Sequence, residues 1–280
     1  MSGAISLARV RRLGLTPVLC AVPLGVVIVC AMASDVLVPD ATKQDMALGV
    51  VKPGVAGHLL GTDKLGRDIF QMAVAGARSA VVGPVCIALG SMVLGVVLGT
   101  MAGYFGGWLD VGLTKYADLL LAMPTTLIAL VVAGLVGGGY WVTVAVLMVL
   151  FSPTDIRLVR SAVMTQATRP YIESAKVLGL SNRRIMFRHI LPNVAPVALA
   201  TMLLNVAFAL VGMSALSFLG LGVGPGEPDW GRQLSDARKL LTSNPAAVIT
   251  PGVLIIVTAA AINLLGDWLQ ERAARQGRRR

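Results

Sequence analysis

Six long runs of apolar residues alternate with shorter polar segments along the 280-residue chain. A helix needs roughly 17 to 25 mostly apolar residues to cross a bilayer, because the hydrocarbon core is about 30 Å thick. Each run meets this requirement, so the pattern predicts an all-α polytopic membrane protein with six transmembrane helices. The predicted spans are residues 16–33, 79–102, 119–136, 140–158, 194–218 and 246–266.

The uninterrupted apolar stretch of the fourth run is short, because it runs into Pro153, Asp155 and Arg157. We retain it as a span, since an even number of spans places both basic ends of the chain on one side of the membrane. The composition agrees with a membrane protein: 56% of the residues are hydrophobic, 14% are charged, and the mean hydropathy is +0.78. We interpret the first run as a retained anchor, because no clear cleavage site for a signal peptide follows it.

The basic residues predict how the chain is oriented. Lysine and arginine in short loops stay on the cytoplasmic side of a membrane. If the N-terminus is cytoplasmic, the inner segments hold 16 of the 24 basic and 6 of the 14 acidic residues, and the outer segments hold eight of each. Both termini are therefore expected in the cytoplasm. The inner segments on this topology are 1–12, 104–118, 155–193 and 267–280.

The same topology accounts for the high pI of about 10.2, so we do not expect nucleic-acid binding. No lysine follows a glycine, which excludes the G-K-[ST] sequence of a phosphate-binding P-loop. The only histidines, His58 and His189, fall on opposite sides of the predicted membrane, so no paired-histidine metal site is expected. The sequence predicts no catalytic, cofactor-binding or metal-binding residue, and no enzymatic activity in this chain.

Small and polar residues within the spans indicate how the helices pack. Gly95, Gly99 and Gly103 repeat every four residues, which places them on one helix face where another backbone can approach closely. This face predicts a contact within the bundle, with subunit pairing or gating as the alternative. Pro124 is expected to kink the third span, and Asn205 to form a hydrogen bond with another helix. Asp155 is expected near an inner helix end, satisfied by water or by Arg157.

The polar island "RPYIESAKVLGLSNRRIMFRHILPN", residues 169–193, predicts two short helices. Pro170 suits a first helical turn, Glu173 then lies near the positive end of the helix dipole, and Gly179 can end the helix in a left-handed conformation. Tyr171, Ala175 and Leu178 are expected to form one apolar face on this first helix.

Ser181 is the expected N-cap of the second short helix, and Pro192 is expected to end it before the fifth span. The resulting knob could dock in a groove of a partner protein and transmit a push into the fourth and fifth spans. The alternative is a basic amphipathic loop that lies on anionic lipid.

This island resembles the E-A-A-x-x-x-G signature, followed by L-P, of the permease subunits of binding-protein-dependent ABC importers. Three further stretches, "HLLGTDKLGRDIF", "SFLGLGVGPGEPDWGRQL" and "GDWLQERA", resemble segments of the dipeptide/oligopeptide/nickel permeases, C-type subunit. The resemblance implies a type I ABC importer permease fold in a bacterial cytoplasmic membrane, with a cytoplasmic coupling helix that is seated in an ATPase subunit. The implied coupling residues are Tyr171, Glu173, Ser174, Ala175, Gly179, Arg183, His189, Leu191 and Pro192.

The resemblance also implies partners: a homologous second permease subunit, two ATP-binding subunits that carry ATP and Mg, and an extracytoplasmic solute-binding protein. The implied solute is a short peptide or a related compound such as glutathione, a nickel chelate or haem. A stand-alone channel or secondary transporter is the alternative, although the scarcity of ionisable residues within the spans disfavours a proton- or sodium-driven mechanism. A membrane scaffold without transport is a third possibility.

On the extracytoplasmic side, Asp63 and Arg67 are expected to pair on a short helix capped by Thr62, and Trp230 is expected to anchor at the membrane interface. The resemblance implies that these outer elements meet the solute-binding protein. The predicted organisation is a cytoplasmic segment 1–15, a first transmembrane helix 16–33, an extracytoplasmic segment 34–78, a core transmembrane domain 79–266 with a cytoplasmic loop 155–193 and an extracytoplasmic loop 219–245, and a basic cytoplasmic tail 267–280.

Overall fold

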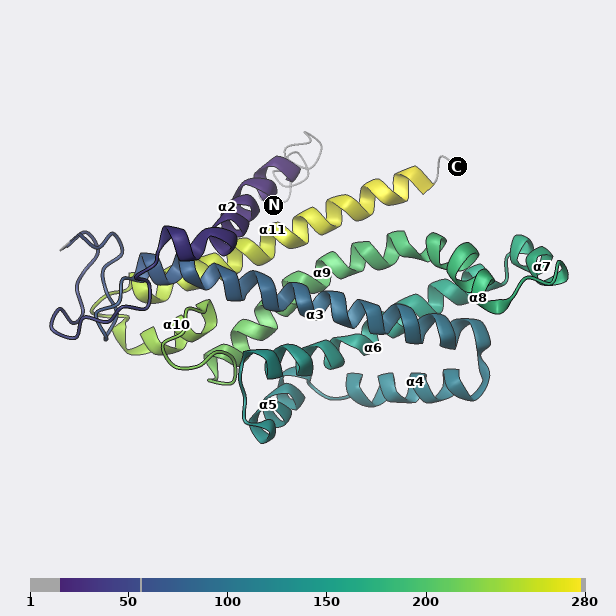
Figure 1. The fold of residues 1–280 in the computed structure, drawn as a ribbon, viewed down its shortest axis with the longest axis horizontal. Helices are drawn as coiled ribbons and strands as arrows, with labels where there is room; N and C mark the ends of the chain where they lie inside the picture. Colours follow the sequence, from purple (N-terminus) through teal and green to yellow (C-terminus); the bar gives the residue numbers. More distant parts are fainter. Residues whose placement is uncertain (1–15, 56, 278–280) are drawn as a thin grey trace, which may run out of the picture.

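A computed structural model describes residues 16–55 and 57–277, and these form an elongated bundle of helices (Figure 1). The predicted cytoplasmic segment 1–15 and the terminal Arg278–Arg280 lie outside the described residues. The main helices are α2 (Thr16–Leu37), α3 (Ile69–Phe105), α4 (Gly107–Leu121), α5 (Thr125–Val136), α6 (Tyr140–Ala167), α7 (Pro170–Val177), α8 (Asn182–Arg184), α9 (Leu191–Phe218), α10 (Trp230–Ala237) and α11 (Ala246–Gly277).

Within the residues that the structure describes, five helices, including α2, α3, α6 and α11, are long and apolar enough to span a membrane. The fifth begins at Asn182 and continues through α9. The pair α4 and α5 gives up to six spans if it counts as one, which agrees with the predicted all-α polytopic fold. Each of five predicted spans lies inside one observed helix, because a long apolar stretch can satisfy its backbone only as a helix in a membrane.

The predicted third span, 119–136, is not continuous. Its residues belong to α4 and α5, whose axes are bent by 91° at a short break. Pro124 is the N-cap of α5, and a proline cannot donate the backbone hydrogen bond that would continue the preceding helix. The kink expected at Pro124 is therefore present, and it is large enough to divide the span. α4 returns beside α6, where Arg157 pairs with Asp118 and Arg160 pairs with Asp110.

Helix α3 lies at the centre of the bundle and packs against α2, α6 and α9 (Figure 1). Its contact with α6 uses the predicted glycine face. A Cβ atom built on Gly95 would lie 2.5 Å from Cβ of Asp155, and one built on Gly103 would lie 2.7 Å from the carbonyl oxygen of Arg160. Gly99 meets the carbonyl oxygen of Ile156 in the same way. Side chains at these three positions would force α3 and α6 apart.

Asp155 lies in this contact and is fully buried, so the expectation that water or Arg157 would satisfy it is wrong. Arg157 turns away to Asp118, and Asn205 on α9 donates a hydrogen bond of 2.8 Å to Oδ1 of Asp155. The interhelical role expected for Asn205 is confirmed. The close approach that Gly95 permits is the reason that Asp155 is enclosed.

Candidate functional site

The first candidate site is formed by residues 169–193, here called the α7 end of the bundle. Helix α7 has Pro170 in its first turn and Glu173 near its N-terminus, as the sequence predicts. Ser174 donates its hydroxyl proton to the carbonyl oxygen of Pro170 at 3.1 Å. Proline tolerates the first turn because its missing N–H has no partner there, and Glu173 is stabilised by the helix dipole.

The buried face of α7 differs from the predicted one. Ile172 and Ala175 are buried in a cluster with Val163 of α6 and Val194 of α9, while Tyr171 and Leu178 remain exposed. The predicted common face of Tyr171, Ala175 and Leu178 is therefore wrong. Residues three apart share a helix face. Ile172 and Ala175 lie on the face of α7 that packs against α6 and α9 of the same chain.

Gly179 ends α7 with φ of +73°, as predicted. Leu180 donates its backbone hydrogen bond to the carbonyl oxygen of Ala175 at 3.2 Å, which closes the turn. A Cβ atom built on Gly179 would meet nothing within 4 Å. The requirement for glycine here is thus the left-handed backbone, which L-residues with a side chain rarely adopt, and the space beside it is open.

From Asn182 the chain is helical through Pro192 and on to Phe218, so the predicted end of the second short helix at this proline is wrong. Residues Ile185–Ile190 form a π-helix, and α9 begins directly after it. The change from π-helix to α-helix occurs beside Pro192, which lies in the first turn of α9 and has no backbone N–H to donate. Ser181 occupies the predicted N-cap position, but its side chain makes no capping hydrogen bond.

Hydrogen bonds join this end to two helices of the bundle, α3 and α6. The hydroxyl of Tyr104, near the end of α3, donates to Oδ1 of Asn182 at 2.9 Å, and Lys176 lies 5.6 Å from the centroid of the Tyr104 ring. Tyr171 donates to Oε1 of Gln166 at 2.8 Å. No local pattern indicates the contact to Tyr104, because this residue lies far from residues 169–193 along the chain.

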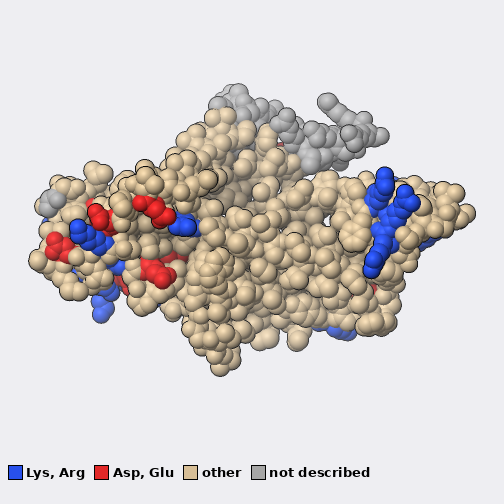
Figure 2. Space-filling view, in the orientation of Figure 1, with Lys and Arg blue, Asp and Glu red and all other residues tan. Residues whose placement is uncertain are grey.

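The exposed surface of the α7 end combines apolar and basic side chains. Val177 is 88% exposed, Leu178 is 78% exposed, and Phe187 lies beyond them. Lysine and arginine gather over this end of the molecule (Figure 2). The exposed basic residues that surround the apolar tip are Lys176, Arg183, Arg184 and Arg188. Apolar side chains exposed in a charged rim are typical of a protein interface.

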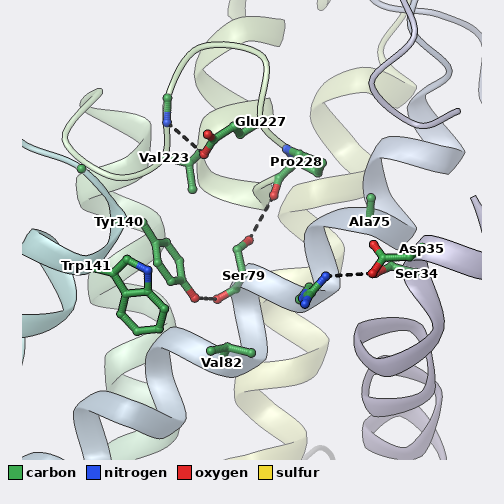
Figure 3. A pocket seen from close by; sticks show the side chains of 13 residues that line it. Ser34, Asp35, Ala75, Ser79, Val82, Tyr140, Trp141, Val223, Glu227 and Pro228 are labelled. Atoms are coloured by element: carbon green, nitrogen blue, oxygen red, sulfur yellow. Dashed lines mark hydrogen bonds and ion pairs between the residues drawn. The ribbon is translucent and has the colours of Figure 1, made fainter. Parts of the chain in front are cut away.

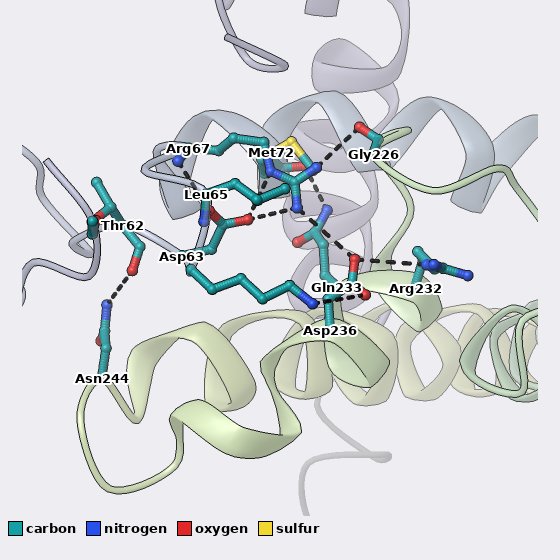
Figure 4. Close-up of polar contacts among 12 residues, drawn as sticks. Thr62, Asp63, Leu65, Arg67, Met72, Gly226, Arg232, Gln233, Asp236 and Asn244 are labelled. Atoms are coloured by element: carbon teal, nitrogen blue, oxygen red, sulfur yellow. Dashed lines mark hydrogen bonds and ion pairs between the residues drawn. The ribbon is translucent and has the colours of Figure 1, made fainter. Parts of the chain in front are cut away.

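The second candidate site is the opposite, α10 end, formed by residues 38–68 and 219–245 (Figure 4). The predicted pair is present: Arg67 lies 2.6 Å from Asp63 and is only 2% exposed. Arg67 also donates to the carbonyl oxygen of Gly226 at 3.1 Å and lies 3.9 Å from Asp236. One buried guanidinium thereby joins the segment before α3 to the segment around α10.

The predicted short helix at Asp63 is absent, since these residues form a turn, and Thr62 does not cap it. Thr62 is buried, accepts a hydrogen bond from the backbone of Val51 at 2.8 Å and donates to the carbonyl oxygen of Gly49 at 2.6 Å. Asn244 donates to the carbonyl oxygen of Thr62 at 3.2 Å (Figure 4). Threonine joins distant backbone segments here, which a local capping pattern could not indicate.

Trp230 is 1% exposed, so its predicted role as an interfacial anchor is wrong. Its ring lies against α3 at Gly76, where a Cβ atom would come within 2.8 Å of Cδ1, and Nε1 donates to the carbonyl oxygen of Ala73 at 2.8 Å. Asp229 precedes it as the N-cap of α10 and accepts from Ser79 at 3.0 Å.

Burial raises the pKa of Asp229 above its ordinary value, and hydrogen bonds from the backbone of Arg232 and from Ser79 only partly oppose this effect. The folded state therefore binds the proton on the Asp229 carboxyl more tightly than the unfolded chain does. The protonated Asp229 contributes fully to the free energy of unfolding below the ordinary pKa of aspartate. That contribution is lost as the pH rises through the raised pKa.

Comparison with known proteins places the chain in a family. Residues 95–278 match the model of the binding-protein-dependent transport system inner membrane component. The chain belongs to this family. The match includes the whole α7 end, and the sequence-based prediction of the family is confirmed.

Curated relatives extend the similarity beyond the family model. The chain is 36% identical to the Dipeptide transport system permease protein DppC of Alkalihalophilus pseudofirmus, over 77% of this chain and 71% of the relative. It is 36% identical to the Glutathione transport system permease protein GsiD of Pectobacterium atrosepticum, over 77% of this chain and 72% of the relative. It is 32% identical to the Di/tripeptide transport system permease protein DppC of Pseudomonas aeruginosa, over 88% of this chain and 83% of the relative.

Proposed function

We propose that this chain forms half of the translocation pathway of an ATP-driven importer of short peptides. It would pair with a homologous second permease subunit, two ATP-binding subunits and an extracytoplasmic solute-binding protein. ATP and Mg would bind to the ATP-binding subunits, since the sequence has no P-loop. Relatives named for dipeptide, di/tripeptide and glutathione transport support a short peptide as the solute.

We place the α7 end and both termini in the cytoplasm of a bacterial cell, with the bundle in the cytoplasmic membrane surrounded by lipid. The excess of basic residues in the inner segments supports this orientation. The α10 end would then face outward, toward a solute-binding protein. The opposite orientation would require seven basic residues of 155–193 to cross the membrane.

The observation that carries the proposal is the construction of the α7 end. Its apolar tip and basic rim are exposed, whereas Ile172 and Ala175 pack directly on α6 and α9. A partner seated on Val177 and Leu178 would therefore displace α7 together with the ends of two spanning helices. Interiors packed this closely transmit displacement, since they compress very little.

The predicted coupling residues take specific roles in this arrangement. Glu173 stabilises the first turn of α7, and Gly179 allows the chain to reverse toward α8. Ala175, which the resemblance implies as a coupling residue, is buried within this chain. We therefore propose that Ala175 sets the distance between α7 and the bundle and that the partner contacts the exposed side.

Affinity purification of the tagged chain from mild detergent, followed by identification of co-purifying subunits and an ATPase assay, tests the proposal. We expect a second permease, P-loop ATPase subunits, and ATP turnover that rises when a binding protein loaded with dialanine or trialanine is added. A homogeneous chain without nucleotide-binding partners in several gentle detergents would contradict the proposal and favour the channel alternative.

A further inference from the structure

An open cavity of about 700 Å³ lies at the α10 end, between α2, α3, α6 and the loop before α10 (Figure 3). Cavities of a few hundred to about 1,000 Å³ are typical of small-molecule sites. One side carries the aromatic residues Tyr140 and Trp141, with Val82 below them, and Glu227 and Pro228 stand across from them (Figure 3).

The wall is held in place by hydrogen bonds of its own. Tyr140 donates its hydroxyl proton to the carbonyl oxygen of Ser79 at 2.9 Å, and the Ser79 hydroxyl lies 3.2 Å from the carbonyl oxygen of Pro228. These contacts join α6, α3 and the loop before α10. The cavity is therefore formed before any ligand arrives, which lowers the entropy cost of binding.

The cavity contains one cationic and two anionic side chains among its lining residues. Arg78 pairs with Asp35 at 3.0 Å, but both side chains are largely exposed, so water weakens this pair. Glu227 accepts only a backbone hydrogen bond, from Gly224 at 3.3 Å, and no cation pairs with it within the described part of the chain. The lining thus offers an unpaired carboxylate and a guanidinium whose present partner is easily exchanged.

We propose that this cavity binds a short zwitterionic peptide by its two ends, an inference that rests on the proposed import of peptides and on the outward orientation of the α10 end. The ammonium group of the peptide lies between the carboxylate of Glu227 and the ring face of Trp141, which attracts cations. The peptide carboxylate takes the place of Asp35 on Arg78, where a guanidinium can donate two parallel hydrogen bonds.

The same arrangement explains how the cavity could bind peptides with different side chains. The remaining contacts are made by apolar or aromatic surfaces such as Val82, Val223 and Tyr140. These surfaces accept side chains of different shapes, while the two charged ends specify only that the peptide is unblocked. The cavity would receive solute at the outer surface and would prefer free peptides over acetylated ones.

A photoreactive dipeptide of alanine and benzoylphenylalanine, with both ends free, tests the inference. The probe is irradiated with the assembled transporter in lipid nanodiscs, without binding protein, and the attachment sites are mapped by mass spectrometry. We expect adducts on the cavity wall, and labelling about tenfold weaker for the N-acetylated probe and for Glu227→Gln, because a hydrogen bond between charged groups is lost. Arg78→Gln should have a similar effect, with a smaller loss for Arg78→Lys.

The control variants are Asp40→Asn and Lys239→Gln, which change exposed charges at the same end outside the cavity lining and should label like the wild type. In the wild-type protein alone, adducts found outside the cavity wall would overturn the inference. Equal labelling by the free and the N-acetylated probe would overturn it as well. Peptide uptake by wild-type proteoliposomes separates the two proposals. Uptake without charge-dependent cavity labelling rejects only the cavity, whereas charge-dependent labelling without ATP-driven uptake rejects the import function.

Discussion

The two ends of the bundle use charged residues in opposite ways (Figure 2). At the α10 end, Arg67 and Asp63 are enclosed and paired, and they join segments far apart in sequence. At the α7 end, the arginines point outward and make no ion pair within the described residues, while apolar packing holds the structure together. Buried charges that are already paired fix a shape, whereas exposed unpaired charges remain available to a partner.

The largest expected effect comes from breaking the buried pair. Asp63→Ala should destabilise the protein by about 3 to 5 kcal/mol, because it leaves the guanidinium of Arg67 buried without its nearest carboxylate. Thermal unfolding of the purified protein measures this loss. Lys64→Gln is the matched control, since Lys64 is exposed and lies 3.8 Å from Asp236, and it should cost less than about 1 kcal/mol. Equal losses in both variants would show that burial of the pair does not matter.

A smaller loss is expected for Trp230→Phe. The substitution removes the hydrogen bond from Nε1 to Ala73 and leaves a small gap against Gly76, at a cost of about 1 to 2 kcal/mol. Trp108→Phe is the control, because Trp108 is 85% exposed and should change stability by less than about 0.5 kcal/mol. If Trp108→Phe were the more damaging change, the buried role of Trp230 would be wrong.

Gly179→Asp sharpens the comparison by separating stability from coupling. An aspartate held in the left-handed conformation of Gly179 should lower the free energy of unfolding by about 1 to 2 kcal/mol. Its charge would lie beside the proposed ATPase contact. Gly54→Asp is matched, since Gly54 has φ of +80° and equally open surroundings at the opposite end. We expect similar thermal stability in both variants and loss of transport only in Gly179→Asp. Wild-type transport by Gly179→Asp at normal membrane levels would contradict the coupling role.

The smallest effect is expected for Ser181→Ala. Serine at an N-cap usually contributes about 1 kcal/mol, but the hydroxyl of Ser181 makes no capping hydrogen bond. Alanine should therefore change the thermal unfolding midpoint and the ATPase rate very little. A loss of stability of about 1 kcal/mol would indicate that Ser181 caps α8 in the assembled transporter.

The sequence predicted those features that depend on neighbouring residues. Apolar runs marked the spanning helices, and Pro170, Glu173 and Gly179 marked the start and end of α7, because these signals act within one or two turns. The sequence could not show that Asp155 and Trp230 are buried. Each is enclosed by a helix more than 50 residues away, at a glycine that permits close approach.

The face of α7 and the division of the third span illustrate the same limit. Periodicity showed that α7 has an apolar side, but tertiary packing selected Ile172 and Ala175 as the inward pair. Likewise, Pro124 predicted a kink, while the 91° angle depends on where α4 packs against α3 and α6.

The length of α3 gives the two ends a common mechanical element. Ala73 accepts the hydrogen bond from Trp230, and Tyr104 donates to Asn182, so one unbroken helix touches both ends. Tyr104 follows Ala73 by 31 positions in this helix, which corresponds to about 47 Å of rise and exceeds the thickness of the hydrocarbon core. Because a helix resists stretching, α3 keeps a constant length and moves as a rigid body. A tilt of α3 at one surface of the membrane therefore also displaces its end at the other surface.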